Sequence, residues 1–171
     1  MMFYAITGAI NGITSILLGG FTLKKRFRSK ISAIFAFVCF VMALWSFGYF
    51  FWMLSDSYDA ALFWVRILMA GAIFIPVSFL HFIILFLEID RFKKWIKWVY
   101  LFFVIFLVLD FTPWYIKSLE PVSFLSYWPK AGIAFHFFLF FWLLVFLLCF
   151  VLLFRELYSN KLDQTKKKHI I

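Results

Sequence analysis

Charged residues are scarce in this sequence. Asp, Glu, Lys and Arg make up 15% of its 171 residues, whereas apolar residues make up 66%. Ordinary soluble domains are about 25% charged and about 45–50% apolar. The two cysteines are too few for the disulfide framework of a small secreted module. This composition excludes a soluble globular domain and a disordered chain, and it indicates an integral membrane protein.

Long uncharged stretches alternate with short charged ones and predict the membrane-spanning helices. A bilayer core of about 30 Å needs about 20 helical residues. We expect an all-α, polytopic bundle of five transmembrane helices that forms a single domain over residues 1–171. The expected spans are about 2–23, 31–54, 60–87, 95–112 and 132–155, of which the fourth is the shortest. The segment 110–130, which holds three of the four prolines, is expected to be non-helical.

The basic residues predict how the chain is oriented. Five of them lie in 24–30, four in 88–97 and five from Arg155 onward, and a five-span chain places all 14 on one side of the membrane. Because basic residues favour the cytoplasmic side, the N-terminus is expected outside and the C-terminus in the cytoplasm. The net charge of +9 is then a topology signal and does not indicate nucleic-acid binding.

Arg66 is the most informative polar residue, because a charge inside a span is costly and usually has a partner or faces a cavity. Residue counting places it in the outer half of its span, together with polar residues of the other spans. We expect a candidate ligand-binding pocket formed by Asn11, Tyr49, Arg66, Asp110 and His136, with Asp110 as the first candidate for an ion pair with Arg66. The alternative is that Arg66 reaches the outer headgroups alone.

The sequence offers no catalytic motif, and its cysteines and histidines do not suggest a metal site. Cys39 and Cys149 lie mid-span without CxxC spacing, as expected for small buried residues. His81 and His136 fall in opposite halves of the bilayer by residue counting. We therefore expect no metal and no other cofactor.

The pair Gly8 and Gly12 forms a GxxxG pattern in the first apolar run. Small residues let two helices approach closely. Packing against a neighbouring helix of the same chain is the favoured interpretation, and a homodimer remains the alternative.

Several short strings occur in a characteristic order. They are Ala43-Leu44-Trp45 with Tyr49, Phe63-Trp64-Val65-Arg66-Ile67, Gly71, Pro76, Leu80-His81-Phe82, Tyr127-Trp128-Pro129-Lys130-Ala131-Gly132 and Lys166-Lys167-Lys168-His169-Ile170. In this order the chain resembles the N-terminal seven-transmembrane region of bacterial sensor histidine kinases. The resemblance covers nearly the whole chain but only the first five of the seven spans.

The resemblance implies a sensory input module in the bacterial inner membrane that passes an extracellular or membrane signal to a cytoplasmic output domain such as a histidine kinase. Trp45, Pro76 and His81 match the pattern without an assigned role. Ile170-Ile171 after a basic cluster is expected to begin a further span, so that the chain is incomplete, lacks the output domain and has no enzymatic activity. The expected partner is the lipid bilayer, and a small ligand is left open.

The alternative function is a small membrane transporter or transporter subunit. It would require polar residues along a path through both halves of the bilayer and an inverted repeat. The inner half offers few polar side chains beyond Ser78, His81 and Glu88.

Overall fold

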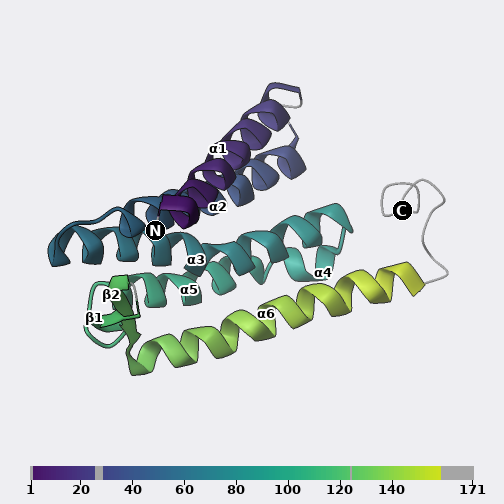
Figure 1. Cartoon of the computed structure of the whole chain (residues 1–171). Helices are drawn as coiled ribbons and strands as arrows, with labels where there is room; N and C mark the ends of the chain where they lie inside the picture. Colours follow the sequence, from purple (N-terminus) through teal and green to yellow (C-terminus); the bar gives the residue numbers. More distant parts are fainter. Residues whose placement is uncertain (1, 26–28, 124, 159–171) are drawn as a thin grey trace.

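The computed structural model describes residues 2–25, 29–123 and 125–158 of the chain (Figure 1). The elements in chain order are α1 (Met2–Lys25), α2 (Lys30–Met53), α3 (Tyr58–Phe86), α4 (Asp90–Lys93), α5 (Ile96–Asp110), β1 (Ile116–Val122), β2 (Leu125–Ala131) and α6 (Ile133–Tyr158). Helices overlap all five segments in which spans were expected. The expected further span at 170–171 and most of the basic tail lie outside the described residues.

Four helices of the described chain are long and apolar enough to cross a membrane: α1, α2, α3 and α6. Helix α5 has 15 residues, which corresponds to about 22 Å at about 1.5 Å per residue. It is shorter than a typical bilayer core of about 30 Å. The short helix α4 precedes α5 along the chain and lies beside the C-terminal end of α3.

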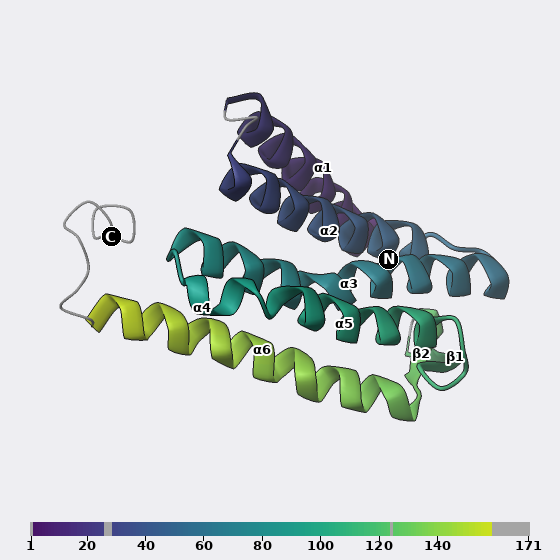
Figure 2. The ribbon, with the colours of Figure 1, turned by 180° about the vertical axis from the view of Figure 1, so that it is seen from behind.

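Helix α3 lies at the centre of the bundle. It packs against α2 on one side and against α5 and α6 on the other, and α1 covers the far side of α2 (Figures 1 and 2). The chain reverses direction between successive long helices, so that the end of α2, the start of α3, the end of α5 and the start of α6 meet at one end. The β-hairpin lies there, and we call this end of the molecule the hairpin end.

Glycines permit the close contact between α2 and α3. A Cβ atom added to Gly71 would lie 2.5 Å from the backbone nitrogen of Trp45, and one added to Gly48 would lie 2.6 Å from that of Leu68. In α1, Gly8 lies against the Ser46 carbonyl and Gly12 against Phe47, both on α2. The GxxxG pair therefore packs within the chain, as the sequence favoured.

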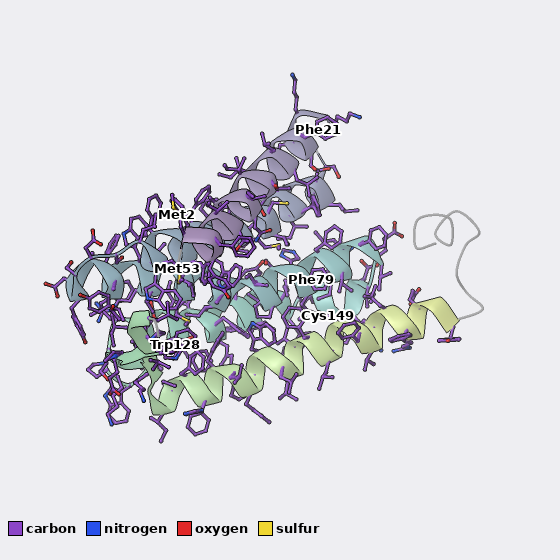
Figure 3. The ribbon with its side chains drawn as sticks, viewed as in Figure 1. Met2, Phe21, Met53, Phe79, Trp128 and Cys149 are labelled. Carbon is purple, nitrogen blue, oxygen red and sulfur yellow. The ribbon has the colours of Figure 1, made fainter. Side chains whose placement is uncertain are left out.

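Large apolar side chains cover the outside of the two edge helices, α1 and α6 (Figure 3). On α6 these exposed residues include Ile133, Phe137, Phe140, Leu143, Leu147 and Phe150. A soluble protein rarely exposes a continuous apolar surface of this kind. The arrangement fits a bundle whose edges contact lipid.

The segment 110–130 was expected to be non-helical, and most of it forms an antiparallel β-hairpin that the expected all-α bundle did not include. Ile116 pairs with Ala131, Leu119 with Pro129 and Val122 with Leu125. Proline is tolerated because it cannot donate a ladder hydrogen bond but can occupy an edge strand, and both strands of a two-stranded ribbon are edges. Ser123 adopts a positive φ of 56° in the turn between the strands.

The hairpin is held against the α2–α3 connection. The indole Nε1–H of Trp52 donates to the Tyr127 carbonyl at 2.8 Å, and the Tyr127 hydroxyl donates to the Asp56 carbonyl at 3.2 Å. At its base, the Gly132 N–H donates to the Tyr115 carbonyl at 2.8 Å. These contacts make the hairpin a cap on the end of the bundle.

Candidate functional site

The candidate site lies at the hairpin end, where α5 stops beside the first half of α3. Helix α5 ends at Asp110 with Phe111 as its C-cap residue. The Thr112 hydroxyl donates to the Leu109 carbonyl at 2.6 Å, and Pro113 follows. A proline just beyond the C-cap cannot continue the helix. The chain therefore turns sharply and brings Tyr115 back toward Asp110.

Arg66 projects from α3 to the end of α5. Its Nη2 group donates to the Phe111 carbonyl oxygen at 3.4 Å, and its Cζ atom lies 5.7 Å from the centre of the Phe111 ring. The last carbonyl groups of a helix lack partners within the helix and carry partial negative charge, which attracts a cation. Arg66 thus serves as a side-chain cap for α5.

Arg66 and Asp110 are neighbours, but the expected ion pair does not form a direct contact. Neither carboxylate oxygen of Asp110 has a hydrogen-bond partner among the described residues. The two charges are nevertheless close enough to interact electrostatically. Asp110 is fully buried, whereas Arg66 is only half-buried and donates to the Phe111 carbonyl instead.

Tyr115 completes the group. Its side chain is fully buried, and its hydroxyl has no hydrogen-bond partner among the described residues. Burial raises the pKa of the Tyr115 phenol, and the negative charge of Asp110 raises it further. The phenol therefore stays protonated at neutral pH and is available as a hydrogen-bond donor.

These three residues form one cluster of unsatisfied polar atoms. Across the described ranges, the buried side-chain nitrogen and oxygen atoms without a partner are Arg66 Nε, Asp110 Oδ1 and Oδ2, and Tyr115 Oη. Buried polar groups normally have hydrogen-bond partners, and each one that lacks a partner calls for an explanation. Their gathering at one place marks the Arg66–Asp110–Tyr115 cluster as the candidate functional site.

An apolar cavity of about 320 Å³ adjoins this cluster. Tyr115 belongs to both, since it lines the cavity and carries one of the unsatisfied atoms. The cavity is bounded by the end of α2, the first half of α3, the hairpin and the start of α6. The lining residues that carry the argument below are Trp52, Leu68, Met69, Tyr115, Ala131 and Phe135.

The other three residues of the expected pocket do not join Arg66. The Asn11 amide donates to the Ser46 hydroxyl at 2.7 Å in the α1–α2 interface. Tyr49 stacks on Trp45 and meets Trp52 edge-on, with ring centres 6.2 and 5.7 Å away. His136 is exposed on α6. Residue counting gives depth in the bilayer but not the direction in which a side chain points, and this explains the difference.

The remaining pattern residues lie away from the cluster. Trp45 is partly exposed on α2, and Pro76 is buried within an uninterrupted α3. His81 Nδ1 lies 3.4 Å from the Tyr100 hydroxyl of α5. In the described chain, no three His, Cys, Asp or Glu side chains gather as a metal-binding group.

The residues expected in the candidate site from the sequence did not include Tyr115, Trp52 and Trp128. Trp52 and Trp128 pack together with ring centres 5.6 Å apart, and Figure 3 shows Trp128 on the hairpin. Residues 116–120 do not alternate strictly between apolar and polar types, and the two prolines of the hairpin argue against a strand. The sequence therefore offered no clear signal for a strand here.

The unsatisfied hydroxyl of Tyr115 leads to a prediction about stability. Tyr115→Phe removes a buried donor that has no partner, so the free energy of unfolding is expected to stay constant or rise by about 1 kcal/mol. Tyr127→Phe is the matched control, because it removes a hydroxyl that donates to Asp56 and should cost about 1 kcal/mol. Thermal unfolding in detergent would measure both. A larger loss in Tyr115→Phe than in the control would contradict this description of the cluster.

Comparison with known proteins adds one match. Residues 9–171 match the family model described as the N-terminal 7TM region of histidine kinase. No curated protein and no solved structure matches the chain.

Proposed function

The chain belongs to the N-terminal seven-transmembrane region of histidine kinases, and we propose that it receives a signal at the hairpin end and passes it to the cytoplasmic ends of its helices. The family region is the sensory part of these proteins, not the kinase domain, and the chain is a multi-pass membrane protein. The observation that carries the proposal is the Arg66–Asp110–Tyr115 cluster of unsatisfied polar atoms.

The proposed topology has five spans, with the N-terminus outside and the hairpin on the outer face. The alternating direction of the helices supports it, because α1, α2, α3, α5 and α6 cross the bundle in turn (Figure 2). The described basic residues Lys24, Lys25, Lys93, Lys94 and Arg155 then lie at the end opposite the hairpin, as expected for a cytoplasmic face.

Cysteine labelling tests this topology. We expect Asp56→Cys and Ser126→Cys to react with a membrane-impermeant maleimide in intact cells, since both positions lie in exposed segments of the hairpin end. Lys25→Cys and Lys94→Cys should react only after the membrane is opened. The native Cys39 and Cys149 are buried and should give little background. The reverse labelling pattern would overturn the orientation.

Helix α3 is suited to carry the signal across the membrane. It holds Arg66 near one end and contacts α2, α5 and α6 along its length. A stimulus that favours one arrangement of the polar cluster would shift the population between two packings of the bundle. The transporter alternative is less well supported, because the unsatisfied groups of the described chain are confined to the hairpin end and do not form a path to the opposite end.

A chimeric kinase tests the proposed function. The chain is joined to a cytoplasmic histidine kinase module, and autophosphorylation is measured in membrane vesicles. Asp110→Asn removes the charge that the cluster is built around and is expected to shift the basal rate by about fivefold or more. Lys117→Gln in the exposed hairpin is the control and should leave the rate unchanged. The unfused chain should incorporate no phosphate. A rate within twofold of the parent for Asp110→Asn would count against a sensory role of the cluster.

A further inference from the structure

The cavity beneath the hairpin combines apolar walls with Tyr115, whose buried hydroxyl has no hydrogen-bond partner among the described residues. We propose that it binds an uncharged, single-chain amphiphile, with the chain in the cavity and the head group at the Tyr115 hydroxyl. The inference rests on the proposed sensory function and deepens it by naming the class of ligand that the module detects.

The walls of the cavity favour an apolar chain. Leu68 and Met69 come from α3, Trp52 from α2 and Phe135 from α6. The charged residue among the lining side chains is Lys130, whose ammonium already contacts Glu120 at 3.2 Å. Apolar lining with a few placed polar groups is the usual composition of a small-molecule site.

The Tyr115 hydroxyl determines the chemistry of the head group. Tyr115 lines the cavity, and its hydroxyl can donate a hydrogen bond, whereas Arg66 and Asp110 are not among the lining residues. A head group that accepts a hydrogen bond, such as a hydroxyl or a primary amide, would satisfy this donor. A charged head group would be buried among apolar side chains without a free partner, since Lys130 already contacts Glu120, and this is costly.

The volume limits the length of the chain. The cavity measures about 320 Å³, near the lower end of the range for ligand pockets, about 300–1,000 Å³. If each non-hydrogen atom occupies roughly the ~30 Å³ of a water molecule in the liquid, about ten atoms fit. A single chain of about eight to ten carbons matches this space, whereas two long acyl chains do not.

The position of the cavity explains how such a ligand would act. Its walls come from α2, α3, the hairpin and α6, so that one bound molecule would contact every element that meets at this end except α5. A ligand shifts an equilibrium only by binding one state better than the other. Binding here would favour the packing in which these four elements enclose the chain.

Photocrosslinking would locate the ligand. The full chain is placed in phosphatidylcholine nanodiscs and irradiated with a decanol that carries a diazirine at the end of its chain, and the labelled residues are identified by mass spectrometry. We expect label on Trp52, Met69 or Phe135 at low probe concentration, competed by decanol and decanamide but at least tenfold less well by decanoate or decylamine. Label spread over the exposed faces of α1 and α6 alone would overturn the proposal, as would equal competition by the charged compounds.

Two variants and one control test the geometry. Ala131→Trp fills the cavity from the hairpin and should abolish saturable labelling, whereas Ile133→Trp, two residues on and exposed on α6, should leave it intact. Tyr115→Phe should weaken competition by decanol about fivefold through the lost hydrogen bond and leave competition by decane unchanged. If Ala131→Trp and Ile133→Trp are both labelled as strongly as the parent chain, the cavity is excluded as the site.

Two further measurements identify the source of the ligand and its effect on the kinase. Competition by dioctanoylglycerol in the nanodisc would indicate a neutral membrane lipid that inserts one of its eight-carbon chains, and competition by added decanol alone would indicate a molecule from outside. Decanol is then added to the chimeric kinase. Saturable labelling with an unchanged phosphorylation rate would refute the proposed sensing of this ligand while the binding site stands. A decanol-dependent rate with labelling elsewhere would refute the site while a sensory function stands.

Discussion

Gly71→Ala is expected to lower the free energy of unfolding by about 1–3 kcal/mol, the usual cost of inserting a methyl group where there is no room for it. The added Cβ would lie 2.5 Å from the Trp45 nitrogen and 2.8 Å from the Val41 carbonyl oxygen. These are backbone atoms, so no side chain can rotate to make space, and α2 and α3 would have to separate. Because α3 also contacts α5 and α6, the shift would spread to the rest of the bundle.

The chain supplies its own control. Gly20 lies on α1 with no atom within 4 Å of its added Cβ, so Gly20→Ala should be neutral or stabilising by about 1 kcal/mol through helix propensity. Gly48→Ala should resemble Gly71→Ala, since its Cβ would lie 2.6 Å from the Leu68 nitrogen. Unfolding by SDS titration in mixed micelles would compare the three. Equal stability of Gly71→Ala and Gly20→Ala would show that α2 and α3 are not packed at this distance.

Arg66→Ala is expected to destabilise the bundle by about 3 kcal/mol. The substitution removes the donor to the Phe111 carbonyl at the end of α5. It also removes the positive charge that lies near the fully buried Asp110. Breaking a buried charge pair by deleting one partner typically costs about 3–5 kcal/mol, because the other charge is left buried without compensation. The missing direct contact places the expected value at the lower end of this range.

A double-mutant cycle separates the two contributions. In an Asp110→Asn background no buried charge remains, so Arg66→Ala should cost only the helix cap, about 1 kcal/mol. The difference between the two costs is the coupling between Arg66 and Asp110. Arg155→Ala, in the exposed last turn of α6, is the control and should be neutral. If Arg66→Ala lowers the free energy of unfolding equally in both backgrounds, Arg66 acts only as a cap of α5, and its electrostatic role is contradicted.

The hairpin end combines the features that a sensory site requires. The polar cluster lies at the junction of α3, α5 and the segment that leads into the hairpin, and the cavity lies at the junction of α2, α3, the hairpin and α6. Tyr115 belongs to both. Tyr115 therefore links α5, through Asp110, to the cavity between α2, α3 and α6.

The polar residues show that counting residues along a helix predicts depth in the bilayer but not the direction of a side chain. Arg66 and Asp110 were expected at similar depth, and they are neighbours in the structure. Asn11, Tyr49 and His136 were expected at similar depth too, but Asn11 faces Ser46 and His136 faces outward. Depth follows from the rise of about 1.5 Å per residue. Direction follows from the rotation of each helix, and a helix that is apolar on every face carries no sequence signal for that rotation.

The sequence by itself determined that this is a membrane protein and where its helices lie, because lipid demands apolar side chains on every face over a fixed length. It also indicated that Gly8 and Gly12 pack within the chain. Only the tertiary structure decided that Gly48 and Gly71 join α2 to α3, that 116–131 forms a hairpin, and that Tyr115 meets Asp110 beside a cavity. Each of these depends on contacts between segments far apart along the chain, and such contacts leave no periodic pattern in either segment alone.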